Sequence, residues 1–123
     1  MTKLEFGNLK VYQKSLRLVV VCRAIARTLP REENELADQL RRAALSVQLN
    51  IAEGAGEFSR RDKARFYRIA KRSATETSAA LDAVEAFRMR TADDTEEGQN
   101  LTAEIVPMLL RMIKNLESSI PTR

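Results

Sequence analysis

A dense run of basic side chains between residues 60 and 72 is the part of this sequence with the clearest chemical potential. It holds seven arginines and lysines and a single acid, Asp62. Guanidinium groups match phosphate oxygens with a planar set of donors, and neutralising several phosphates releases counterions, which makes binding strongly salt-dependent. On a helix most of these side chains fall within an arc of about 140°. The sequence therefore predicts a phosphate-contacting stripe formed by Arg60, Arg61, Arg65, Arg68, Lys71 and Arg72.

Arg41 and Arg42 are candidates to extend this stripe. Two other interpretations stay open: the charged face is simply solvated, or it pairs with segment 91–106, which holds five acids and no base, in the same or a neighbouring subunit. Only Phe58 and Tyr67 are aromatic side chains near the stripe, whereas proteins that bind single strands usually stack bases on aromatic platforms. We therefore expect contacts with the backbone of RNA or DNA rather than recognition of specific bases.

The sequence lacks the side chains on which most catalytic and metal sites depend. It has no His and one Cys, Cys22, so zinc clusters, Cys–His pairs and internal disulfides are excluded. Di-iron sites of helical bundles need Glu-x-x-His pairs, and the glycines near residue 54 lack the ending of a phosphate loop. Glu53 and Glu76 are better interpreted as partners of arginine. We expect no enzymatic activity, catalytic residue, cofactor, metal or small-molecule substrate, and Cys22 to be a core residue.

The length and composition predict one soluble domain spanning residues 1–123. Of the 123 residues, 44% are apolar and 31% are charged, with a formal net charge of +4. The longest apolar run, residues 18–22, is far shorter than the roughly 20 residues of a membrane span or the 7 to 15 of a signal peptide. A cytoplasmic location without membrane contact is the expectation.

Helices must position the basic stripe, since only three prolines and four glycines interrupt the chain. Apolar residues at helical spacing predict helices over about 8–28, 35–53, 60–90 and 95–118. Asn8 and the Ser59–Asp62 pair are expected N-terminal caps, Gly54 a C-terminal cap, and Pro107 a kink or boundary. Short connections favour an all-α, antiparallel up-and-down four-helix bundle. A helix-turn-helix is disfavoured because the third helix is too long for a compact recognition helix.

Two of these helices carry apolar or small residues on faces that one bundle cannot cover. Leu45 and Leu49 lie opposite the expected inner face of the second helix, and Ala79, Ala83 and Ala86 continue the outward arc of the third. Exposed apolar surface of this kind usually marks association, so we expect a homo-oligomer. The competing interpretation is that the alanines merely favour helix on a solvated face.

The second helix also carries a motif that resembles a known family. Its residues read Leu36-x-x-Gln39-Leu40-Arg41-Arg42-Ala43-Ala44-x-Ser46-Val47-x-x-Asn50-Ile51-Ala52-Glu53-Gly54, flanked by Leu9-x-Val11-Tyr12-Gln13, Pro30 and Phe66-x-x-Ile69-Ala70-x-x-Ser73-x-x-Glu76. This pattern is similar to that of the four-helix bundle proteins encoded within intervening sequences of bacterial 23S ribosomal RNA genes. The resemblance covers roughly residues 6–87.

The resemblance implies a ring-like homopentamer, as in family members that include the nucleic-acid-binding accessory variability protein of retroelements, which works beside a reverse transcriptase. It implies that Arg41 and Arg42 face a shared basic surface and that Asn50, Glu53 and Glu76 fix helix and subunit contacts. Tyr12 replaces a frequent Trp, and Arg72 replaces a small residue, which puts the packing around Ser73 in question. We therefore expect a non-enzymatic, oligomeric nucleic-acid-binding protein. The alternative is a scaffold for a protein partner, such as a reverse transcriptase or an acidic protein.

Overall fold

A computed structural model describes residues 4–87 and 92–118 of the protein, and the described chain is helical. The helices are α1 (Lys10–Arg27), α2 (Asn34–Gly56), α3 (Arg60–Ala86) and α4 (Ala92–Ser118), with short 3-10 turns η1 (Glu5–Asn8) and η2 (Arg31–Glu33). The predicted all-α class with four helices is confirmed, and no strand occurs within these ranges. α3 ends at Ala86 rather than at the expected residue 90, and residues 88–91 lie outside the described part.

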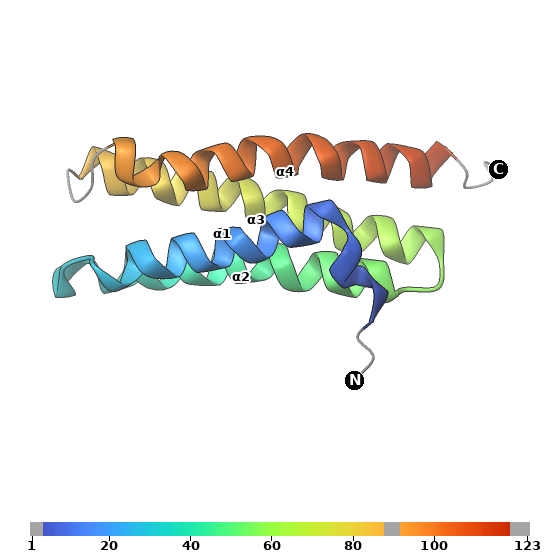
Figure 1. The fold of residues 1–123 in the computed structure, drawn as a ribbon, viewed down its shortest axis with the longest axis horizontal. Coiled ribbons are helices and arrows are strands. Elements are labelled where there is room, and N and C mark those ends of the chain that lie inside the picture. The colour runs from blue at the N-terminus through green and yellow to red at the C-terminus, as the bar shows by residue number, and fades with distance from the viewer. Residues whose placement is uncertain (1–3, 88–91, 119–123) are drawn as a thin grey trace.

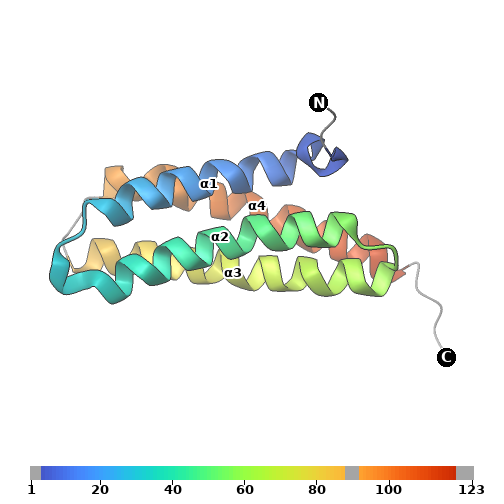
Figure 2. The same ribbon diagram turned by 90° about the horizontal axis from the view of Figure 1, so that it is seen from below.

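The four helices run antiparallel to their neighbours in chain order (Figures 1 and 2). α1 and α3 each pack against both α2 and α4. Within the described ranges, the diagonal pairs α1/α3 and α2/α4 make no close backbone approach. Each helix therefore buries one face in a shared core and leaves the opposite face to solvent.

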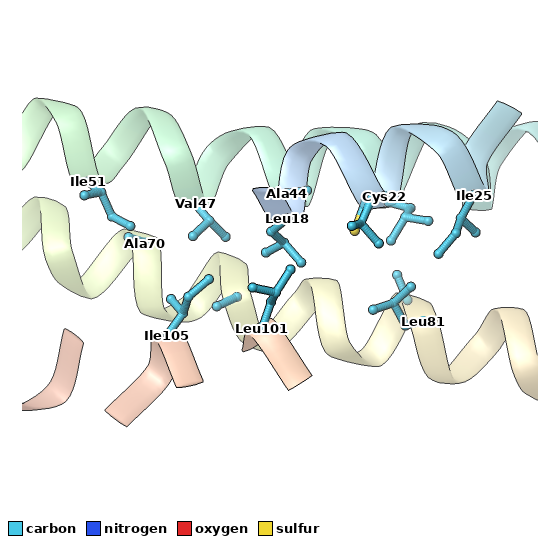
Figure 3. Close-up of a cluster of buried hydrophobic side chains, with 14 of the residues drawn as sticks. Leu18, Cys22, Ile25, Ala44, Val47, Ile51, Ala70, Leu81, Leu101 and Ile105 are labelled. Atoms are coloured by element: carbon cyan, nitrogen blue, oxygen red, sulfur yellow. The ribbon is translucent and has the colours of Figure 1, made fainter. Parts of the chain in front are cut away.

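The core is aliphatic and continuous along the bundle (Figure 3). α2 buries the predicted stripe, in which Leu40, Val47 and Ile51 are fully covered. Cys22 of α1 is also fully buried, and this burial raises the pKa of its thiol to about 12, which makes it an inert core residue as expected. Close-packed side chains of this kind supply most of the folding free energy of a small bundle.

Helical spacing predicts apolar residues on both faces of α1, Met108 and Met112 on the inner face of α4, and Phe87 at the inner end of α3, and the structure differs in detail. α1 turns Val11, Leu18, Cys22 and Ile25 inward, so its other apolar stripe is only half-buried or exposed. α4 buries Leu109 and Ile113, whereas the predicted methionines beside them are half-buried. Phe87, expected at the inner end of α3, is 59% exposed. The helical period was recognised in each case, but the choice between adjacent positions depends on where the neighbouring helix lies.

The start of α3 follows the predicted capping signal. The Oγ of Ser59 accepts a hydrogen bond from the backbone N–H of Asp62 at 3.1 Å. This bond satisfies one of the donors that a helix leaves free in its first turn. Two other expectations differ from the structure: Asn8 belongs to η1 while Leu9 stands at the cap of α1, and Pro107 marks no boundary, because α4 continues through it to Ser118, the predicted end.

Gly54 is a packing residue inside α2, not the cap that ends it. The helix continues to Gly56, and Gly54 is buried against the ring of Tyr67 on α3. A Cβ added at Gly54 would lie 2.6 Å from Cε1 of Tyr67 and 3.2 Å from the backbone oxygen of Lys63. The absence of a side chain at Gly54 therefore allows the end of α2 to approach the start of α3 closely.

A small polar network joins the middle of α2 to α3. The hydroxyls of Ser46 and Ser73 lie 2.8 Å apart, and Nδ2 of Asn50 donates to the Oγ of Ser46 at 3.1 Å. Thr77 donates to the backbone oxygen of Ser73 at 2.8 Å. Arg72 is exposed beside this network, so the large residue at this position leaves Ser73 buried and hydrogen-bonded. Satisfied polar contacts of this kind fix the register between packed helices.

Candidate nucleic-acid interface

The predicted basic stripe lies on the solvent-facing side of the first half of α3. Arg60, Arg61, Arg65, Arg68 and Arg72 are all exposed, and we call these five residues the basic face. From Arg61 onward their spacing of three and four residues keeps the side chains on one side of the helix. Lys71 is half-buried and is not counted in the basic face. Tyr67, which sequence placed near the stripe, is buried in the core.

Most of the basic face has no acidic partner within the described part of the chain. Arg68 is the exception, because its guanidinium pairs with the carboxylate of Glu117 near the end of α4. The guanidinium carbon of Arg65 lies 4.5 Å from the centroid of the Phe66 ring, a cation–π contact that leaves its N–H donors available. Four of the five arginines therefore keep their charge available for an anion outside the bundle.

Two of the acids that could have neutralised the basic face, Glu97 and Glu104, are paired with a different helix. Arg17 on α1 binds Glu97 through two hydrogen bonds, of 2.6 and 2.9 Å, and Lys14 pairs with Glu104. The hydrogen bond and charge of Arg17 lower the pKa of Glu97, and Glu97 in turn raises the pKa of Arg17. Glu97 and Glu104 thus stabilise the contact between α1 and α4, and no ion pair in the described ranges joins segment 91–106 to the basic face.

Arg41 and Arg42 do not join the basic face as simply as predicted. Arg41 pairs with Asp38 one turn earlier on α2. Arg42 is exposed without an ion pair in the described ranges, but it lines a surface groove together with Glu35 and Asp38. Arg42 lies on α2 between Gln39, which contacts Glu76, and Ser46, which contacts Ser73. Arg42 is therefore next to a part of α3 that follows Arg72, the last arginine of the basic face.

Lys63 has a structural role that the sequence did not predict. Its Nζ donates to the backbone oxygens of Gly54 at 3.3 Å and Ala55 at 2.9 Å. A cation at this place adds a donor to the last carbonyls of α2 and offsets the negative end of the helix. The contact also fixes the connection between α2 and α3, and with it the start of the basic face.

Charge is separated along the bundle because the connected ends of α2 and α3 lie opposite the start of α4 (Figures 1 and 2). We define a basic half as residues 4–18, 46–73 and 106–118, which hold twelve basic and five acidic residues. The acidic half, residues 19–45, 74–87 and 92–105, holds five basic and twelve acidic residues. The basic face therefore sits within a half of the molecule whose net charge is strongly positive.

The predicted interface residues are accessible, with one partial exception. Leu45 and Leu49 on α2 are 43% and 49% exposed. Ala79 and Ala86 are exposed and Ala83 is half-buried, and Ala79 lines a groove of 520 Å³ between α3 and α4. Sequence reasoning did not single out Leu16 and Val20 on α1, which are also exposed and apolar. Several faces of the bundle thus carry apolar surface that no other described residue covers.

The described residues do not assemble a metal or membrane site. No group of three or more His, Cys, Asp or Glu side chains comes together as metal ligands in the part that the structure covers. No helix within the same ranges has the length and hydropathy needed to cross a membrane.

The fold and its surface define a small helical-bundle protein with a basic face. The sequence profile of the 23S rRNA-intervening sequence protein family matches residues 7–111, and the chain belongs to this family. It is similar in structure to a protein of unknown function from the S23 ribosomal protein family of Bacteroides thetaiotaomicron, with 29% identity and a TM-score of 0.78. That similarity covers 85% of this chain and 98% of the other. Among curated proteins, none matches this chain significantly.

Proposed function

We propose that this chain is a non-enzymatic, oligomeric nucleic-acid-binding protein that contacts phosphates through its basic face. The observation that carries the proposal is the set of exposed arginines on α3, of which Arg60, Arg61, Arg65 and Arg72 have no acidic partner within the described ranges. Unpaired arginines on one exposed face suit a polyanion, because each can form hydrogen bonds to phosphate oxygens without breaking an internal ion pair.

Binding is tested by titrating RNA with the wild-type protein at several salt concentrations. With about four or five phosphates contacted, the logarithm of the association constant should fall against the logarithm of salt concentration with a slope of about −3 to −5. Retention should therefore be strong near 50 mM salt and weak near 200 mM. Absence of RNA and DNA retention at the lower concentration would contradict the proposal.

Two observations support the oligomeric part of the proposal. Leucines of α2 are exposed, and the family resemblance implies a homopentamer. Glutamate at Leu49 should shift the assembly toward the 13.9 kDa monomer, because a charge cannot be buried in an apolar contact without a partner. Leu110 on α4 is matched in exposure, at 48% against 49% for Leu49, and offers a control. Sedimentation velocity compares wild type, Leu49→Glu and Leu110→Glu; identical behaviour of the two variants, or a monomeric wild type, would refute this contact.

A protein-interaction scaffold is the second candidate function, and the apolar surface of α1 and α2 favours it. Leu16, Val20, Leu45 and Leu49 expose more aliphatic surface than a solvated bundle needs. A protein partner that is co-purified with the chain and survives nuclease treatment would support the scaffold. A complex that nuclease dissolves would support the nucleic-acid function.

A further inference from the structure

The turn between α2 and α3 presents an aromatic ring entirely to solvent. Phe58 is 101% exposed, so it is as accessible as in an extended chain, and it lies within the basic half of the bundle. Phe87 is also exposed, at 59%, but it lies at the end of α3 in the acidic half. A fully exposed phenyl ring contributes nothing to the core and is free to contact a ligand.

The turn that carries Phe58 is held on both sides. Before it, the N–H of Glu57 donates to the backbone oxygen of Gly54 at 3.2 Å. After it, Ser59 caps α3 through the N–H of Asp62 at 3.1 Å, and the N–H of Lys63 donates to the backbone oxygen of Ser59 at 3.0 Å. The Nζ of Lys63 then ties the first turn of α3 to the last turn of α2. The ring is therefore presented by a short, hydrogen-bonded connection, which limits the entropy lost when it binds a ligand.

The charges around the turn select the kind of ligand. Arg60 and Arg61 directly follow the turn, both are exposed, and neither has an ion pair in the described part of the chain. An apolar protein pocket that accepted Phe58 would bring these cations against its rim without compensation. A nucleotide suits both the ring and the cations, because its base can stack on the ring of Phe58 and its phosphate accepts hydrogen bonds from the guanidinium groups.

We propose that Phe58 is a stacking site for an unpaired base and that the basic end of the bundle therefore prefers single-stranded RNA or DNA to duplex. In a duplex the faces of the bases are covered by their neighbours, so an exposed ring gains a partner only at an end, a loop or a single strand. The inference rests on the proposed nucleic-acid function and adds the class of substrate. Arginines supply contacts that both substrates share, and Phe58 supplies the contact that distinguishes them.

The test compares an unstructured RNA of about 16 nucleotides with the same RNA annealed to its complement, using fluorescence anisotropy. Phe58→Ala should weaken binding of the single strand by about 5- to 100-fold, and it should change duplex binding by less than about twofold. Phe87→Ala is the matched control and should leave both affinities unchanged. The variant at Phe58 should fold normally, because the wild-type ring makes no core contact.

A second measurement uses the absence of tryptophan from the chain. Phe58→Trp introduces a single indole, whose emission should be quenched when a base stacks on it, whereas the emission of Phe87→Trp should not change. Equal weakening of single-strand and duplex binding by Phe58→Ala, or RNA binding without quenching of Phe58→Trp, would overturn the inference while leaving the proposed function intact. Failure of the wild-type chain to bind either RNA would overturn both.

The same variants distinguish RNA from two other partners that the ring of Phe58 could contact, a second copy of the chain and a lipid surface. If Phe58→Ala changes the sedimentation of the protein without RNA, the ring packs against another copy of the chain and the stacking proposal is wrong. If the emission of Phe58→Trp shifts to the blue with phosphatidylserine vesicles but is unchanged by RNA, the ring enters a lipid surface and the proposal is equally wrong. Unchanged sedimentation and no response to vesicles, together with quenching by single-stranded RNA, would support it.

Discussion

Combined replacement of Arg61, Arg65 and Arg68 by glutamate is expected to remove RNA binding from this protein. The three side chains lie within two turns of α3 on its exposed side, so the substitution places negative charge where the phosphates would lie. Loss of the contacts of Arg61 and Arg65, and of Arg68 where it leaves Glu117, should lower the salt slope by about 2 to 3, and repulsion should reduce affinity by about 100-fold or more near 100 mM salt. Filter binding across a salt series gives both quantities.

A matched reversal elsewhere separates a local effect from a change in net charge. Arg23, Arg27 and Arg31 are exposed, lie in the acidic half, and can be replaced by glutamate with the same change of total charge. This control should retain most of the RNA affinity, because only the distant field of the molecule changes. Equal loss of binding in the two triple variants would show that net charge alone governs the interaction. Circular dichroism should show that both remain helical.

Replacement of Gly54 by alanine is expected to give a large loss of stability for the addition of one methyl group. The new Cβ would lie 2.6 Å and 2.8 Å from two ring carbons of Tyr67, and the backbone oxygen of Lys63 stands at 3.2 Å. The ring is 4% exposed and cannot rotate into solvent without opening the contact between α2 and α3. Overpacking of this kind costs about 1–3 kcal/mol, which exceeds the helix propensity gained on replacing glycine by alanine.

Gly56 provides the control for this prediction. It lies in the last turn of the same helix, and a Cβ added there would meet no atom within 4 Å. Gly56→Ala should therefore leave the stability unchanged or raise it slightly, whereas Gly54→Ala should lower the Tm by roughly 4–12 °C. Thermal unfolding followed by circular dichroism measures both. A Gly54→Ala variant as stable as Gly56→Ala would mean that α2 and α3 can separate at this point without cost.

The sequence was sufficient to predict the helices but not which positions they bury. α2 has one long apolar stripe, with Leu45 and Leu49 opposite it, and the stripe is the face that the structure buries. α1 has apolar residues on two faces, and the structure buries Leu18 and Cys22 while Leu16 and Val20 are exposed. Apolar residues at helical spacing identify the faces that could be buried. In α1 two faces have similar hydropathy, and packing against α2 and α4 determines which of them is buried.

Helical spacing predicts the basic face, but it does not predict which of its arginines pair with acids. Helical spacing alone places Arg61, Arg65, Arg68 and Arg72 on one side of α3. The pairing of Arg68 with Glu117 depends on the register between α3 and α4, which no local pattern records. Gly54 was mistaken for a cap because a glycine near a helix end usually has that role, and its contact with Tyr67 appears only when α2 and α3 are packed.

The separation of charge between the two halves gives the bundle a large electric dipole directed along its helices. A polyanion at low ionic strength would turn the molecule in solution so that the basic end arrives first, before any hydrogen bond forms. The arrangement of subunits then determines how far this field extends. In a cyclic ring with parallel bundle axes the individual dipoles add and one rim becomes attractive to RNA, whereas antiparallel pairing of subunits would cancel them and abolish the orientation.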